Sequence, residues 1–481
     1  TLRISLAPQG GRRGLEDPRV LRRGPMTSYA GKCRLKVLLM ATLFASLSSP
    51  ARGQVDQTFR RLFDRILDLE LRSEVFASAA FDGAADDANA FITPVLNELI
   101  GNTISSLPIT STIAGVTFDL SSGIPRINRE SLGPIFSETA TTVGRRKLVV
   151  GLNHSHYRLD ALRGLQTSDI RFTFTSADVN ESGSIGDHIY ETETIDVYPG
   201  FRVDARQSVF FVTYGLTDRL DAGIAVPWLR LDIEGSARAV INSTSLYERG
   251  VAFNSFNGQP NTPQLETIVP YAESASGLGD VAARIKYAVL RKSDQGGPGG
   301  STGSLVDLAV LAEFRAPISA GDDSEFLRLE KPAAKITLAA SKGRSGLTSH
   351  VNLGYEFRTG ATDSDKLQFF AGFERGLTDD IGLTVDLFAL FDIEDTSILF
   401  PAPVELNIER TGGLFGDLHT MTLVERTNID DRNRDNLLAL SVGLKAVAVE
   451  RLSLLANVFI ALNDAGLRSS IVPTFGLSTY L

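Results

Sequence analysis

The sequence predicts an all-β protein: an antiparallel transmembrane β-barrel preceded by a helical and irregular segment. Two observations support this class. First, apolar side chains occupy every second position in many runs between residues 147 and 481, which is the period of a strand with one apolar face. Second, an export signal precedes these runs, and no later segment reaches 18 consecutive apolar residues. Export without helical spans leaves a soluble periplasmic protein, a secreted protein or an outer-membrane barrel.

The N-terminal part divides into two segments. Residues 1–25 lack an initiator Met, carry six Arg and are interpreted as translated upstream sequence. Residues 26–53 are interpreted as a signal peptide, because basic residues precede the apolar run 37–47 and small residues precede a cut after Gly53. The alternative is an N-terminal anchor, but the run is short for a spanning helix.

Removal of this signal is testable. We expect N-terminal sequencing of the exported protein to find Gln54, or a residue within a few positions of it, because the cut follows small residues. Recovery of Cys33 in the mature protein would contradict the signal peptide.

The charge balance limits the partners. The chain has 48 Lys and Arg against 57 Asp and Glu, and the surplus of acid grows once residues 1–53 are removed. An acidic exported chain is a poor nucleic-acid binder, so we expect no nucleic-acid partner. The single Cys lies in the signal, which leaves no thiol chemistry in the mature chain. The expected partners are outer-membrane lipid, the barrel assembly machinery and a small-molecule solute.

Residues 54–146 are predicted to precede the barrel. Residues 56–72 have apolar side chains at helical spacing, a second helical stretch covers 90–100, and residues 105–146 are irregular and rich in Ser, Thr and Gly. This segment is either a plug inside the pore or a periplasmic appendage, and the pattern does not distinguish the two.

The barrel is predicted to occupy residues 147–481, with about fourteen strands and twelve as the alternative. The expected strands are 147–159, 168–177, 188–198, 201–214, 219–234, 277–290, 304–316, 333–341, 347–358, 366–375, 380–392, 436–447, 451–461 and 470–481. Long connections are expected at 235–276, 317–332 and 393–435, and short ones at 215–218, 342–346, 376–379 and 448–450. Short periplasmic turns and long external loops are typical of outer-membrane barrels.

The strand faces predict which residues line a pore. In lipid, the apolar face of each strand must point outward and the charged face into the lumen. A soluble sandwich would bury the apolar face instead, but many of these runs are longer than ordinary strands. The predicted pore-lining residues are Arg284, Lys286, Asp307, Glu313, Arg315, Asn352, Glu356, Arg358, Glu374 and Asp386. A lumen position should tolerate charge, so Asn352→Arg is expected to be harmless.

One predicted strand changes phase. Its apolar residues hold even positions from Leu220 to Trp228 and odd positions from Leu229 to Ile233, with Pro227 at the change. Because Pro cannot donate to the ladder and is tolerated at bulges, the pattern predicts a bulge or a rim irregularity here.

Two near-repeats, Tyr214-Gly-Leu-Thr-Asp-Arg-Leu220 and Arg375-Gly-Leu-Thr-Asp-Asp-Ile381, are hairpin turns by pattern. Together with Gly277-Leu-Gly-Asp280 and Ser131-Leu-Gly-Pro-Ile-Phe-Ser-Glu138, they resemble motifs of the putative meta-pathway phenol-degradation family of outer-membrane proteins. The resemblance covers residues 130–481. It implies a barrel related to hydrophobic-compound channels such as the long-chain fatty acid transporters.

Few residues indicate a metal-binding or catalytic site. His154 and His156 share a strand face, which is explained either by a metal or by lumen polarity. Asp178, Asn180, Ser182 and Asp187 copy part of a calcium loop but lack its final Glu; such loops are usually solvated turns. No catalytic, zinc or phosphate-binding motif is present, and an enzyme is not expected.

The sequence therefore favours a passive outer-membrane channel for small, hydrophobic or aromatic molecules. The alternatives are a structural or surface-interaction barrel that uses its long loops, and a soluble periplasmic β protein.

Overall fold

The structure is a computed structural model and describes residues 61–63, 81, 83–109, 118–119, 126–127, 134–291, 306–317, 331–344, 346–359, 364–395, 399–413, 416–449 and 452–480. The upstream residues, the signal peptide and most of the predicted helix 56–72 lie outside these ranges. Within them, no helix combines the length and the apolar character needed to cross a bilayer.

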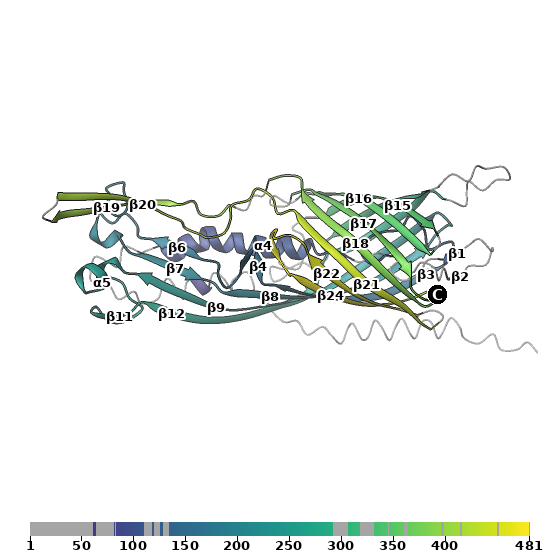
Figure 1. The fold of residues 1–481 in the computed structure, drawn as a ribbon, viewed down its shortest axis with the longest axis horizontal. Helices are drawn as coiled ribbons and strands as arrows, with labels where there is room; N and C mark the ends of the chain where they lie inside the picture. The colour runs from purple at the N-terminus through teal and green to yellow at the C-terminus, as the bar shows by residue number, and fades with distance from the viewer. Residues whose placement is uncertain are drawn as a thin grey trace, which may run out of the picture. The chain divides into compact units, whose positions relative to one another are not determined.

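Twelve antiparallel strands form a closed barrel, which matches the smaller predicted count (Figure 1). Each strand pairs with its neighbours around the barrel, and pairing of β9 with β13 completes the ring. The barrel strands are β3 (Leu148–Leu159), β8 (Phe201–Gly215), β9 (Leu220–Asn242), β13 (Val281–Leu290), β14 (Asp307–Ala316), β15 (Ala333–Arg344), β16 (Leu347–Arg358), β17 (Lys366–Gly376), β18 (Ile381–Asp392), β21 (Leu437–Val449), β22 (Leu452–Ala461) and β24 (Ile471–Tyr480).

The predicted strands 168–177 and 188–198 exist but do not belong to the ring. They contain β6 (Phe172–Thr175) and β7 (Thr194–Tyr198), which extend the sheet beyond the barrel along the far half of β9. The range 235–276, expected as a loop, contains the end of β9 and most of β12 (Glu266–Leu278), which pairs with it. The expected loop 393–435 contains a hairpin of β19 (Val404–Gly413) and β20 (Gly416–Val424).

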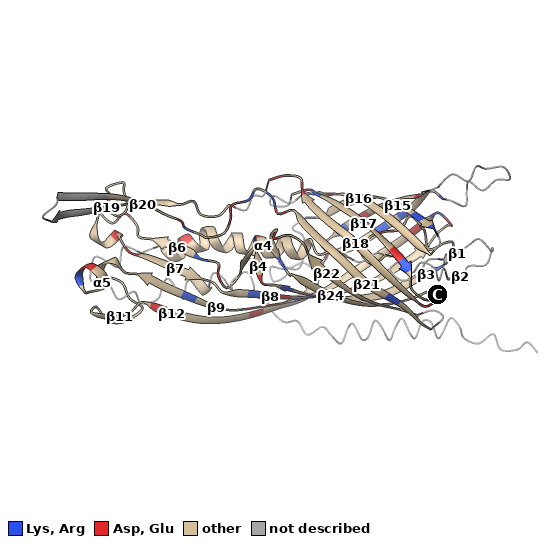
Figure 2. Cartoon of the chain, in the orientation of Figure 1, with Lys and Arg blue, Asp and Glu red and all other residues tan. Residues whose placement is uncertain are grey.

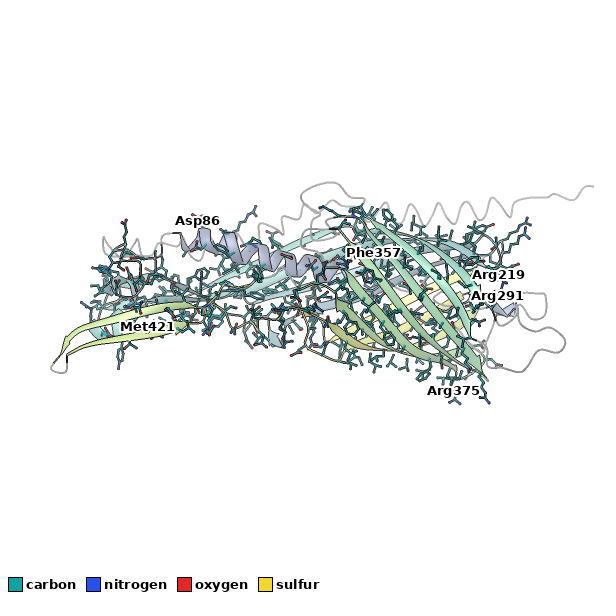
Figure 3. The ribbon with its side chains drawn as sticks, turned by 90° about the horizontal axis from the view of Figure 1, so that it is seen from above. Asp86, Arg219, Arg291, Phe357, Arg375 and Met421 are labelled. Carbon is teal, nitrogen blue, oxygen red and sulfur yellow. The ribbon has the colours of Figure 1, made fainter. Side chains whose placement is uncertain are left out.

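The two near-repeats form the same turn at one end of the barrel, here called the turn end. The amides of Leu216 and Thr217 both donate to Leu220 O, and those of Leu377 and Thr378 both donate to Ile381 O. Gly215 is required where it stands, because a Cβ there would lie 1.9 Å from Gly144 O. Arg219, Arg291 and Arg375 all lie at this end, and the opposite end is called the loop end (Figure 3).

The barrel strands alternate as predicted. On β16 the side chains of Val351, Leu353 and Phe357 are 45–47% exposed on the outer face, whereas His350 and Asn352 are buried on the inner face. The same outward apolar set recurs on β13, β14, β15, β21 and β24. An outer surface of this composition is stable in lipid and unfavourable in water.

On three adjacent strands, the outward residues change from apolar to polar or charged at the same height along the barrel. Toward the turn end, the outward residues of β3, β8 and β9 are apolar; toward the loop end, they include Arg158, Arg202 and Arg230. The change falls at His154, Ser208 and Trp228, which are cross-strand partners. Figure 2 shows charged positions on the parts of β8 and β9 that extend beyond the barrel. The lipid-facing part of these strands therefore ends at this level.

The predicted bulge at Pro227 is wrong. β8 and β9 pair without a register shift, with Val209 opposite Pro227, and odd residues of β9 face inward throughout. The apolar phase changes because the environment outside changes from lipid to water. Pro227 is tolerated because its nitrogen faces the junction where the partner of β9 changes from β13 to β12, and Gly279 N donates to Pro227 O there.

A helical unit packs beside the extended strands. It comprises α3 (Ala84–Asp87), the π-helical turn η2 (Ala88–Ile92) and α4 (Thr93–Ser105). Leu96, Leu99 and Ile100 are buried in one apolar core with the inward residues of the β8 and β9 extensions, such as Leu231 and Ile233. The extension thus has an apolar inside, whereas the inner face of the barrel is largely polar.

The remaining elements are short. They are β1 (Phe118–Asp119), β2 (Arg126–Ile127), β4 (Ala161–Leu162), β5 (Leu165–Gln166), η3 (Ile189–Glu191), α5 (Thr244–Arg249), β10 (Asn257–Gln259), β11 (Thr262–Gln264) and β23 (Leu467–Arg468).

Candidate functional site: a crossed lumen and a pocket at its mouth

Residues 134–143, here called the crossing segment, run across the inside of the barrel. Residues 134–140 of this segment are all buried, although it has no regular secondary structure. Lys445 of β21 donates to Pro134 O at 2.7 Å, and at the other end Val143 N donates to Asp221 of β9 at 2.8 Å. These two anchors lie on well-separated strands of the ring, so the segment spans the lumen.

Glu138 is the most strongly held residue of the crossing segment. Its carboxylate accepts from Lys286 Nζ at 2.8 Å, and the pair is almost fully buried. Its backbone N–H and C=O both bond to the side-chain amide of Asn352, at 2.6 and 2.7 Å. On either side, Ser137 Oγ donates to Asp386 and Ala140 N donates to Ser341 Oγ. The barrel wall therefore satisfies the polar groups of a segment that could not otherwise be buried.

Nine of the ten predicted pore-lining residues are buried on the inner face, and Asp307 is half-buried. Several of them hold the crossing segment instead of facing an open lumen. Asn352 is one of these, so we now expect Asn352→Arg to be damaging, because the change would remove both hydrogen bonds to Glu138. His350, buried beside them, bonds to Asp386.

Five of the other predicted residues form an ion cluster across β13 to β16, together with Lys335: they are Arg284, Glu313, Arg315, Glu356 and Arg358. Glu313 pairs with Arg284, Arg315 and Lys335, and Glu356 pairs with Arg315 and Arg358. The cluster also reaches α4: Arg315 Nη1 donates to Ser105 O, and Arg358 Nη2 donates to Ser106 Oγ, each at 3.4 Å. Cationic groups are favourable at a helix C-terminus, so the cluster holds α4 at the barrel mouth.

Little space remains beside the crossing segment. A cavity of about 30 Å³ lies between Phe136 and Glu138 on one side and the ion cluster on the other, which is room for about two water molecules. Ile135 fits against the wall only because position 443 is Gly, where a Cβ would lie 2.2 Å from Ile135 Cδ1. The crossing segment therefore packs closely against the barrel wall at this level.

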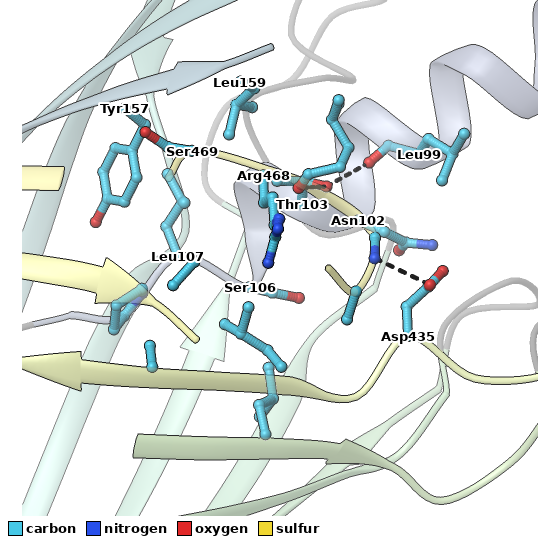
Figure 4. A pocket seen from close by; sticks show the side chains of 18 of the residues that line it. Leu99, Asn102, Thr103, Ser106, Leu107, Tyr157, Leu159, Asp435, Arg468 and Ser469 are labelled. Carbon is cyan, nitrogen blue, oxygen red and sulfur yellow. Dashed lines mark hydrogen bonds between the residues drawn. The ribbon is translucent and has the colours of Figure 1, made fainter. Parts of the chain in front are cut away.

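A larger cavity of about 150 Å³, here called the mouth pocket, lies at the loop end (Figure 4). The last turn of α4 contributes Leu99 and Thr103, and Leu107 follows it. The barrel contributes apolar side chains that include Leu390, Phe459 and Val472. Thr103 Oγ1 donates to Leu99 O, so this hydroxyl is satisfied within the helix.

An aromatic row connects the mouth pocket to the crossing segment. The ring of Phe459 lies 5.4 Å from that of Phe136 and 5.5 Å from that of Phe388, and Phe388 lies 4.7 Å from Phe370. Phe459 lines the mouth pocket, whereas Phe136 and Phe370 line the cavity of about 30 Å³ beside the crossing segment. Apolar surface is therefore continuous between these two cavities.

The charged groups around the mouth pocket are mostly paired. Lys366 pairs with Asp392. Asp435 accepts from Arg163 at 2.9 Å and from Gly466 N at 3.0 Å. Arg468 differs: its side chain points into the pocket in Figure 4, and its buried Nε and Nη1 atoms have no hydrogen-bond partner among the described residues. Burial lowers the pKa of this guanidinium, and only Asp464 opposes the shift by its charge.

The two histidines do not face the lumen. His154 points outward and bonds to Ser208 at 2.9 Å, and His156 bonds to Asp204 at 3.1 Å, so lumen polarity does not explain them. They lie at and beyond the level where the outer face becomes polar. Among the described residues, no three or more His, Cys, Asp or Glu gather as a metal site would require.

The residues of the predicted calcium loop are used within the loop itself. Asp178 accepts from the amides of Ser182 and Gly183, and Asn180 donates to Asp187. The carboxylate that organises this region belongs to no motif and could not be predicted from the sequence. Glu191 is fully buried and accepts from the amides of Val179 and Gly186.

The mouth pocket could not be predicted from the sequence either. Leu107, Phe459 and Arg468 come from segments far apart in the chain, and none belongs to a motif. Tyr271 of β12 is held within the extension: its hydroxyl donates to Pro199 O at 2.9 Å, and burial raises its pKa.

Comparisons with known proteins give only distant likenesses. No family model and no curated protein matches the chain. Solved structures similar to it include an outer-membrane channel from Pseudomonas putida F1, with 10% identity over 71% of this chain and 98% of that one, at a TM-score of 0.37. A Pseudomonas aeruginosa FadL homologue has 9% identity over 70% and 90%, at 0.29. The P. putida toluene transporter TodX has 8% identity over 70% and 90%, at 0.27. At these scores, the barrel is established by the strand pairing of this chain and not by the likenesses.

Proposed function

We propose that this chain is an outer-membrane channel for passive uptake of small hydrophobic or aromatic molecules. The observation that carries the proposal is the mouth pocket: an apolar cavity of about 150 Å³ at the loop end of a barrel with an apolar outer face. An apolar cavity of about this size, built into another protein, stays dry and binds benzene. The mouth pocket is therefore large enough for one aromatic ring.

The route inward is also apolar at first. A molecule that enters the pocket contacts Phe459, and the aromatic row leads from there to Phe136 of the crossing segment. Passage to the turn end then requires the crossing segment to move. We infer that the lumen residues, including those that hold Glu138, act by controlling this movement and not by binding solute.

The pocket is tested by filling it. Ala461→Phe would place a ring in the pocket, whereas Ala456→Phe adds the same ring on the outward face of the same strand. We expect the first variant to weaken toluene binding at least about tenfold, since the cavity cannot hold two rings, and the second to leave it unchanged. Calorimetry on the purified, folded proteins measures both. Equal affinity in the two variants would remove the pocket as the binding site.

The surface-interaction alternative has one observation in its favour. On the hairpin of β19 and β20, Met421 and Leu423 are 66% and 58% exposed. Planar-bilayer recordings separate this alternative from a channel. The soluble alternative conflicts with the apolar outer face of the barrel, and membrane fractionation tests it.

A further inference from the structure

Arg468 is the one charged group lining the mouth pocket, among the described residues, that has neither an ion-pair nor a hydrogen-bond partner for its buried nitrogens. Asp464, the acid whose charge acts on Arg468, already bonds to Arg432 at 3.3 and 3.4 Å. The Nε and Nη1 donors lie on opposite sides of the guanidinium, and a carboxylate can accept a charge-assisted hydrogen bond from either of these N–H groups. Leaving them unpaired in an apolar cavity is unfavourable.

We propose that the mouth pocket binds a small aromatic carboxylate, with its ring among Leu107, Phe459 and Val472 and its carboxylate accepting from one of the buried N–H donors of Arg468. This inference rests on the proposed function and narrows its substrate class.

The pairing of charges in the pocket leaves Arg468 available for an anionic ligand. Lys366 pairs with Asp392, and Asp435 pairs with Arg163, which lies outside the lining, so both lining carboxylates are already engaged by other cations. The volume of about 150 Å³ limits the ligand to one ring and a small substituent. A long acyl chain would not fit in the pocket as it stands.

The test compares benzoate with nitrobenzene, a neutral molecule of nearly the same shape, by calorimetry on the purified full chain. We expect benzoate to bind at least about tenfold more tightly, because its interaction with the guanidinium is charge-assisted. Arg468→Met should abolish this preference and leave nitrobenzene affinity within about twofold. Arg468→Lys should restore part of it. The matched control is Arg434→Met, which removes a nearby exposed arginine paired with Asp395 and should change neither affinity.

The outcomes separate this inference from the proposed function. If nitrobenzene and toluene bind as well as benzoate in the unaltered protein, the carboxylate assignment is wrong and the channel proposal stands. If none of the three binds, the mouth pocket is not a binding site, and the observation that carries the channel proposal is removed. If benzoate keeps its preference in Arg468→Met with heat-modifiable, folded protein, another group recognises the carboxylate and the assignment to Arg468 is overturned.

Discussion

Glu138→Lys is expected to open the barrel. The new ammonium group would lie against Lys286, replacing a buried ion pair of the crossing segment with a repulsion. Breaking a buried pair costs about 3–5 kcal/mol, because one charge is left uncompensated. If the crossing segment relieves this cost by leaving its place, the balance between closed and open states shifts by about 10²-fold or more. In planar-bilayer recordings, the unaltered protein should show little conductance and the variant should conduct.

The control for this prediction is the exchange of both charges. Glu138→Lys combined with Lys286→Glu restores an ion pair of opposite direction and should return the barrel toward its quiet state. A Glu138→Lys variant that is folded by heat modifiability yet conducts no better than the unaltered protein would show that the crossing segment is not the barrier.

Val351→Arg is expected to have the second large effect, on stability. Val351 is 46% exposed on the outer face of β16, between Ala340 and Ala371 on the neighbouring strands. An Arg near the bilayer midplane of such a barrel costs about 2–4 kcal/mol, because a charge must be placed in hydrocarbon or drawn to the interface. Equilibrium unfolding in lipid vesicles measures this loss.

Leu347→Arg supplies the depth control, since Leu347 is exposed on the same face four residues nearer the turn end. Near the interface the same change should cost only about 0–1 kcal/mol. Equal losses at the two positions would mean that this face of β16 does not lie in lipid.

The fold could be read from the sequence wherever alternation was strict. The inner and outer faces of β16 follow directly from the order of its residues, because the period of a strand is two. Alternation does not say which solvent lies on either side. For this reason β6 and β7, whose pattern is that of a water-exposed sheet, could not be told from barrel strands. β12 was missed because Pro270 and small residues interrupt its pattern.

The candidate site was harder to predict, for a different reason. Strand alternation predicts the charged inner faces, but it does not show that the crossing segment runs through the lumen. The crossing segment has no period, and its burial depends on partners far away in the chain: Ser137 and Asp386 are 249 positions apart. Arg468 has no distinguishing sequence context, and only the assembled pocket shows that its Nε and Nη1 atoms are buried without a hydrogen-bond partner among the residues that the structure describes.

The crossing segment also constrains the order in which the molecule can assemble. It leads into β3 at the turn end, while α4, earlier in the chain, packs at the loop end. A helix about 10 Å wide could not be drawn through a closed ring whose inside is already packed. We infer that the ring closes around the chain, with the seam between β3 and β24, which pairs the first barrel strand with the last, forming late. If closure of the ring is slow, the slow step would then be the placement of the chain inside the barrel and not the pairing of the strands.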